Sequence, residues 1–163
     1  TNSEDHYEFK LAKMKLSDIE DLSIFGFGSA NNGGGSDGQE FTFDAVSATA
    51  GQFIYVASED VEFANFFGFA PDYTHSAASI NGDDAIELFE NGNVIDTFGE
   101  INVDGTDQPW EYLDGWAKRH NSTGPDGVGF DLANWSLSGI NALDGETSNA
   151  TAVLPFPIGL YLP

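Results

Sequence analysis

The sequence contains no cysteine and very few basic residues, and both absences limit what the chain can be. Without cysteine there is no disulfide scaffold, no thiolate metal site and no cysteine nucleophile. Only 5 Lys and Arg stand against 27 Asp and Glu, which gives a formal charge of −22. Nucleic acids and anionic membranes are bound through basic side chains, so we expect neither direct nucleic-acid binding nor membrane insertion. No run of 18 apolar residues predicts a membrane-spanning helix.

Aromatic and acidic residues are abundant in the chain. Fourteen Phe, five Tyr and three Trp can fill the core of one domain in a chain of 163 residues. The acids allow two compatible interpretations. They keep a surface hydrated, with repulsion screened by salt over about 8 Å, or some of them bind Ca²⁺, which prefers oxygen ligands.

Short apolar stretches between turn residues predict an all-β fold. Residues 7–11 alternate as a half-buried strand, and a change of phase over residues 12–16 indicates a bulge or a change of sheet. Residues 51–58 form an apolar run typical of a buried strand. In residues 85–98, Asn91-Gly92 predicts a tight hairpin. We also expect a hairpin of residues 24–27 with 41–43, and short strands at 116–120 and 134–137.

One short helix is expected at residues 59–67, with Ser58 as its cap and Gly68 at its end. The apolar tail, residues 151–163, carries three prolines and is a poor interior strand. These patterns together predict an antiparallel β-sandwich with one short helix, in a single domain of residues 1–163.

The chain resembles lamin-tail-like domains in three segments: GSANNGGGSDGQEFTF, NGDDAIELFENGNVIDTFG and INVDGTDQPWEYLDGWAKR. Such domains occur in secreted bacterial and marine surface proteins and in extracellular nucleases. The resemblance covers roughly residues 21–151 and implies an immunoglobulin-like sandwich, an extracellular location and a non-catalytic role. Family members usually have a further apolar strand before the one that corresponds to residues 7–11, and this chain begins almost at that second strand.

Four aspartates are the candidate Ca²⁺ ligands. Asp83 and Asp84 follow a turn glycine, and Asp104 and Asp107 flank a tight acidic loop. None of these positions matches the EF-hand spacing. Asp-Gly pairs are also ordinary turn chemistry, because the side chain bonds its own backbone, so the turn interpretation stays open.

Trp110 and Trp116 lie beside these acids. Large aromatic side chains usually fill a core or its rim, but exposed tryptophans can stack on sugars, and the sequence leaves both roles open. The three histidines, His6, His75 and His120, belong to no catalytic motif, so we expect no enzyme activity.

Three functions follow from these observations. The first is a secreted binding or adhesion module, Ca²⁺-assisted, whose partner is an extracellular polysaccharide or a surface protein. The second is the subunit of an extracellular filament or surface layer, in which the tail of one copy pairs with the edge strand at residues 7–11 of the next. The alternatives to that exchange are a tail folded on its own domain and an edge guarded by Lys10, Lys13 and Lys15. The third is an accessory domain of a secreted nuclease or phosphoesterase.

Overall fold

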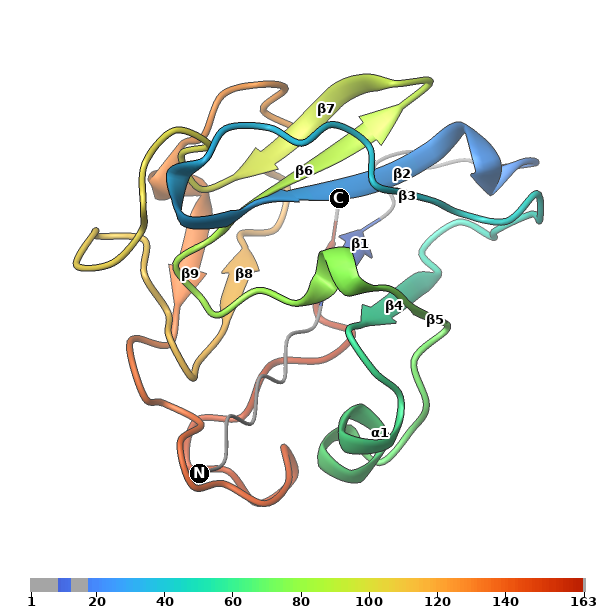
Figure 1. Cartoon of the computed structure of the whole chain (residues 1–163). Coiled ribbons are helices and arrows are strands. Elements are labelled where there is room, and N and C mark those ends of the chain that lie inside the picture. Colours follow the sequence, from blue (N-terminus) through green and yellow to red (C-terminus); the bar gives the residue numbers. More distant parts are fainter. Residues whose placement is uncertain (1–8, 13–17, 163) are drawn as a thin grey trace.

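The computed structural model describes residues 9–12 by their backbone and residues 18–162 completely. Strands dominate these residues, and a single α-helix occurs among them (Figure 1). The strands form a four-stranded, a three-stranded and a two-stranded sheet. This arrangement confirms the β-rich fold with one short helix that the sequence predicts.

The four-stranded sheet is antiparallel and lies across the upper half of Figure 1. Its order is β3-β2-β6-β7, with bounds Phe41–Thr42, Phe25–Ala30, Ala85–Glu90 and Asn93–Phe98. β6 and β7 form the predicted hairpin, in which Asn91 and Gly92 have φ of 51° and 75°. β2 pairs with β3 through Phe27 and Phe41, so the other predicted hairpin is also confirmed.

The three-stranded sheet contains a parallel pair that the sequence did not predict. Its order is β1-β4-β5, with bounds Phe9–Ala12, Phe53–Ala57 and Tyr73–Thr74. β1 is antiparallel to β4, but β4 and β5 run parallel, because the chain returns between them through a helical crossover. β1 pairs only with β4 among the described strands and is therefore an edge strand, as predicted. Tyr7 and the expected change of phase after Ala12 lie outside the described residues.

One core joins these two sheets. Phe27 of β2 and Val56 of β4 are both completely buried and belong to the same cluster. Burying a side chain of this kind is worth about 1.5–3 kcal/mol. The other buried members of the cluster are Leu22, Phe25, Phe43, Ala48, Ile54, Ala77, Ala78 and Leu88.

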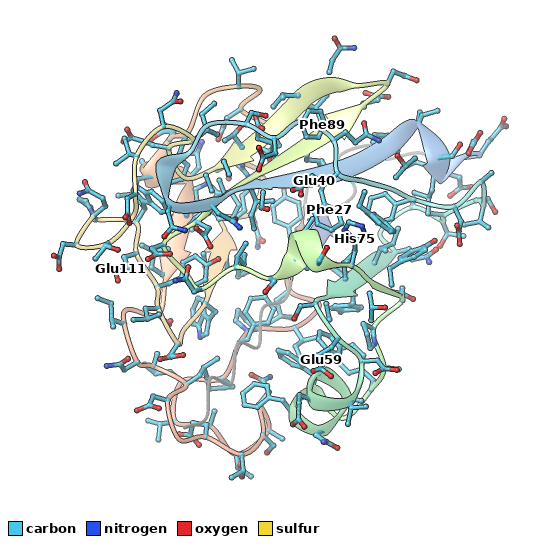
Figure 2. The ribbon with its side chains drawn as sticks, in the orientation of Figure 1. Phe27, Glu40, Glu59, His75, Phe89 and Glu111 are labelled. Carbon is cyan, nitrogen blue, oxygen red and sulfur yellow. The ribbon has the colours of Figure 1, made fainter. Side chains whose placement is uncertain are left out.

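Helix α1 (Val61–Phe67) begins with a different cap from the one predicted. The sequence predicts Ser58 as the cap, but the carboxylate of Glu59 accepts hydrogen bonds from the amides of Val61 and Glu62, each at 2.9 Å. A carboxylate suits this place because the first amides of a helix have no internal partner. Figure 2 shows Glu59 at the start of the helix.

The aromatic face of α1 packs beside β4. Phe63 and Phe69 lie with their ring centroids 6.4 and 4.9 Å from that of Tyr55, which is a half-buried residue of β4. The aromatic cluster near residues 63–73 is therefore largely packing. Across the described residues, no helix has the length and apolar character needed to cross a membrane.

A second aromatic cluster lies beside the end of β7. The predicted strands at residues 116–120 and 134–137 form here as β8 (Ala117–Arg119) and β9 (Trp135–Leu137), an antiparallel pair. Phe98, Trp110 and Tyr112 are the buried members of the cluster, and Phe130 and Trp135 pack against them. Four short 3₁₀ segments complete the described elements: η1 (Leu22–Ile24), η2 (Asn31–Gly33), η3 (Ser76–Ala78) and η4 (Leu132–Asn134).

The tail contains no strand in its described residues, as predicted, and it lies on its own domain. The side-chain amide of Asn149 donates to the carbonyl of Phe156 at 3.1 Å and accepts from its amide at 2.7 Å. The Tyr161 hydroxyl donates to the carbonyl of Thr123 at 2.9 Å. Phe156 and Tyr161 are consequently buried, 6% and 7% exposed.

Candidate functional site

Three loops meet at one end of the four-stranded sheet. Ala30, at the end of β2, lies opposite Ala85, at the start of β6, and Ile86 lies opposite Phe98, at the end of β7. The chain after β2, the turn before β6 and the loop after β7 must therefore leave the sheet at the same end. The four aspartates that the sequence singles out lie on two of these loops, Asp83 and Asp84 before β6 and Asp104 and Asp107 after β7.

Backbone contacts hold the three loops together. The amide of Gly105 donates to the carbonyl of Asp83 at 2.9 Å, and the amide of Gly35 donates to the carbonyl of Ile101 at 2.8 Å. A Cβ atom on Gly33 would lie 2.4 Å from the amide nitrogen of Asp104, so only glycine permits this approach. The acidic loops are thus packed against one another.

Asp83 is a buried carboxylate with one oxygen left without a donor. Its side chain is only 7% exposed, and its Oδ2 accepts a hydrogen bond from the Thr106 hydroxyl at 3.0 Å. Its Oδ1 has no hydrogen-bond partner within the described residues. The Oδ1 of Asn81, two residues earlier in the same turn, is buried and without a partner in the same way. Such orphan acceptors are uncommon, since a buried polar group without a partner costs about 1–3 kcal/mol.

Asp84 is buried beside Asp83, and its charge is unfavourable there. It is 4% exposed, and its two oxygens accept from the amides of Asn32, at 2.8 Å, and Asn81, at 3.3 Å. Burial raises the pKa of its carboxyl, and the nearby negative charges of Asp83 and Asp104 raise that pKa further, against the lowering effect of the two hydrogen bonds. The turn therefore holds two adjacent buried acids.

Tyr112 packs against the same turn. Its amide donates to the carbonyl of Gly82 at 2.9 Å, and its side chain is 7% exposed. Burial raises the pKa of its hydroxyl, and the charges of Asp84 and Asp83 add to that effect. Negative charge thus accumulates around this turn, and no ion pair with a basic side chain relieves it in the part of the chain that is described.

The other two predicted ligands lie at the surface. Asp104 is exposed, and hydrogen bonds from Thr106 lower the pKa of its carboxyl. Asp107 is also exposed, and its amide donates to the Glu111 carboxylate at 2.8 Å. The structure thus gathers Asp83, Asp84 and Asp104 but gives the carboxyl of Asp107 no contact with them. In residues 18–162, no three Asp, Glu, His or Cys side chains are grouped so that they could hold a metal ion.

The two tryptophans take different positions. Trp110 is 2% exposed and packs edge-on against Phe98, so its ring has no face open to a sugar in this structure. Trp116 is half-buried, and its indole nitrogen donates to the carbonyl of Leu154 at 3.0 Å. Trp110 fills the core, and stacking on a ligand by Trp116 stays a prediction.

Two histidines lie in the described part of the chain, and neither belongs to a catalytic triad there. His75 accepts from the amide of Ala77 at 3.2 Å and lies beside Phe27 in the core (Figure 2). His120 is exposed, and its Nε2 lies 2.7 Å from the Ser136 hydroxyl. A serine nucleophile also needs a group that orients the histidine, and no described carboxylate bonds this ring.

Sequence reasoning missed Asn81, which supplies an orphan oxygen. Its signal was the NGDD turn itself, in which an amide and two carboxylates are separated only by glycine. Comparison with protein-family models, with curated proteins and with solved structures found no match to this chain. The resemblance to lamin-tail-like domains therefore stays a prediction.

Proposed function

We propose that the chain is a non-catalytic binding or adhesion module of an extracellular protein, secreted or held at the cell surface, and that Ca²⁺ assists it. We propose an immunoglobulin-like sandwich as its scaffold. The core shared by β2, β6 and β4 supports that scaffold, because a sandwich packs the inner faces of two sheets together.

The observation that carries the binding role is a strip of apolar side chains on the tail. Eight large apolar side chains are strongly exposed in the described residues, and four of these lie in the tail, within the ten residues 153–162. They are Val153, Leu154, Leu160 and Leu162, with exposed fractions of 84%, 49%, 59% and 66%. We call these four residues the tail strip. Concentrated exposed apolar surface is typical of interaction sites.

The tail strip is held in place and does not hang free. The bonds between Asn149 and Phe156 close the chain around Val153 and Leu154, and the indole of Trp116 bonds the carbonyl of Leu154. Tyr161 fixes the chain between Leu160 and Leu162. A surface that is ordered before binding loses less conformational entropy when a partner arrives. This favours a contact surface over a flexible linker.

Charge favours a foreign partner over a second copy. Each chain carries a formal charge of −22, so two copies repel one another wherever their acidic surfaces approach. A surface protein with an apolar patch and a basic or neutral rim avoids that repulsion. We therefore propose a protein partner that covers the tail strip.

Photo-crosslinking tests this role in the whole chain. A photoreactive amino acid replaces Leu160, and the protein is illuminated with intact cells of the organism that encodes it. We expect one cross-linked partner protein. Val46, which is 48% exposed and far from the tail in sequence, is the matched control position. Identical products from both positions, or no protein product from position 160, would contradict the proposal.

Self-assembly is the second candidate, because β1 lies at a sheet edge. An edge strand leaves backbone groups able to pair with another chain. The tail would then leave its own domain and pair with β1 of the next copy, which gives an open filament. In the crosslinking experiment this arrangement would yield products at multiples of the chain mass.

A further inference from the structure

The Asn81-Gly82-Asp83-Asp84 turn combines three features that no single structural role explains. It holds two buried carboxylates, it has two buried side-chain oxygens without donors, and it is bonded to the chain after β2 and to the loop after β7. We propose that this turn, which we call the NGDD turn, binds one Ca²⁺ ion through the side-chain oxygens of Asn81 and Asp83.

The orphan oxygens are the first step of the argument. Asp83 is more than nine-tenths buried, and its Oδ1 has no donor among the described residues. An ionised carboxylate in such a place needs a positive partner, because desolvation strongly disfavours an unpaired charge. The Oδ1 of Asn81 can accept but cannot donate, so it cannot be the partner of Asp83. Both atoms need something that is electron-poor, and a cation satisfies both.

Asp84 strengthens the case on separate grounds. Each of its oxygens accepts only one backbone amide, so each keeps a lone pair. A cation beside Asp83 would also balance the second carboxylate, because Asp84 is the next residue and is 4% exposed. The described ion pairs join Arg119 to Asp96 and Asp126, so they place no positive charge beside Asp83 or Asp84.

The ligand types favour Ca²⁺ over other metals. Amide and carboxylate oxygens are hard ligands, which excludes a preference for softer metals. Ca²⁺ accepts six to eight oxygens in irregular geometry, whereas Mg²⁺ demands a near-ideal octahedron. No three acidic or histidine side chains converge in the described structure, so the proposed set combines Asp83 with the unpartnered amide oxygen of Asn81, and water would complete it. A site with so few charged ligands belongs in the weak range of about 10⁻⁴–10⁻³ M that is typical of extracellular modules.

This site uses only part of the ligand set that the sequence predicts. Asp104 and Asp107 form the more conspicuous acidic loop, but both are exposed, and the Asp107 carboxyl contacts neither of the buried acids. The loop that carries Asp104 borders the site, because the amide of Gly105 donates to the carbonyl of Asp83 and the hydroxyl of Thr106 donates to its Oδ2. The contrast between Asp83 and Asp107 supplies a matched pair of variants.

Calcium titration of the whole chain by calorimetry is the test. The protein is stripped with a chelator and titrated with CaCl₂ in about 0.15 M NaCl, where surface charges are screened over about 8 Å. We expect one Ca²⁺ per chain. Asp83→Asn should weaken binding at least about tenfold, because it removes a charged ligand, while Asp107→Asn should leave the affinity within about twofold.

The melting temperature of Asp83→Asn without Ca²⁺ distinguishes a lost ligand from a folding defect. The amide replaces a buried charge and can still accept from Thr106, so without Ca²⁺ the variant should melt no lower than the wild type. Asn81→Ala is the second variant, because it removes the other oxygen and keeps the amide that donates to Asp84. It too should weaken Ca²⁺ binding.

Terbium luminescence gives a readout that needs no variant. Tb³⁺ replaces Ca²⁺ in oxygen sites and emits when a nearby tryptophan transfers its excitation. The ring of Trp110 comes within 2.5 Å of the Cβ position of Gly105, whose amide bonds the carbonyl of Asp83. We expect emission through tryptophan that Ca²⁺ displaces.

Three results would overturn the site: no saturable Ca²⁺ binding, equal losses in Asp83→Asn and Asp107→Asn, or no Ca²⁺-sensitive terbium emission. The first is the outcome expected if a buried water donates to both oxygens. None of these results bears on the tail strip, so this inference and the partner-binding role fail separately.

Discussion

The Nη2 atom of Arg119 lies 2.5 Å from Oδ1 of Asp96, although the two residues are 23 positions apart in the chain. The Nη1 atom of the same guanidinium lies 2.7 Å from Oδ2 of Asp126, and its Cζ lies 4.4 Å from the centroid of the Trp135 ring. Arg119 is 8% exposed. One buried cation therefore joins β7, β8 and β9.

Arg119→Met should destabilise the fold by about 3–5 kcal/mol, because it leaves Asp96, which is only 15% exposed, without its counter-charge. Burial already raises the pKa of Asp96, and Arg119 is one of the groups that oppose that rise. Urea unfolding followed by tryptophan fluorescence measures the loss. The control is Lys118→Met on the same strand, a half-buried residue without a described ion pair, which should cost less than about 1 kcal/mol. Similar costs for the two variants would refute the role given to Arg119.

Gly82→Ala should cost more stability than Gly51→Ala. Both glycines have positive φ, 90° and 77°, so alanine pays about 1–2 kcal/mol at either position for the left-handed conformation. Only at Gly82 would the new Cβ lie 2.6 Å from a backbone atom, the amide nitrogen of Leu113. That overlap adds about 1–3 kcal/mol, because the backbone cannot move aside cheaply. Thermal melts of the two variants make the comparison, and equal melting temperatures would show that the NGDD turn is not held as tightly as described.

Stability should fall above about pH 10 in a way that depends on Tyr161. Burial raises the pKa of its hydroxyl above the usual 10.0. The folded state therefore holds this proton more tightly than the unfolded state, so its contribution is complete below pH 10 and is lost as the pH rises through the folded pKa. Tyr161→Phe should lower the free energy of unfolding by about 0.5–1.5 kcal/mol at neutral pH, because the bond to Thr123 is lost. Above about pH 10, the free energy of unfolding of this variant should fall less with rising pH than that of the wild type.

Urea unfolding at about pH 8 and about pH 11 tests this pH dependence. The pKa of Tyr112 is also raised by burial, but this residue is present in both proteins, so the difference between them isolates Tyr161. An identical loss of stability in the wild type and the variant would contradict the account of the tail contact.

Local patterns explain which parts of the fold the sequence predicts. Asn91-Gly92 defines the β6–β7 hairpin, and that hairpin alone brings the residues before Ala85 and after Phe98 to one end of the sheet. The neighbourhood of Asp83 and Asp104 follows from it. The geometry of this turn depends on two adjacent residues, so the sequence is enough to predict it.

Features that depend on distant residues were not predictable. β5 is only two residues long and has no periodicity, so its parallel pairing with β4 leaves no signal in the sequence. The burial of Asp83 and the exposure of Asp107 depend on which side chains three separate loops place around them. The same limit applies to Arg119, whose partners lie on other elements.

The oligomeric state of the 163-residue chain tests the central claim most directly, since a partner-binding module needs its tail on its own domain. Light scattering coupled to size-exclusion chromatography measures the mass at high protein concentration. The account predicts a monomer of 17.5 kDa. A polymer that becomes monomeric when residues 151–163 are deleted would contradict it and would support tail exchange instead.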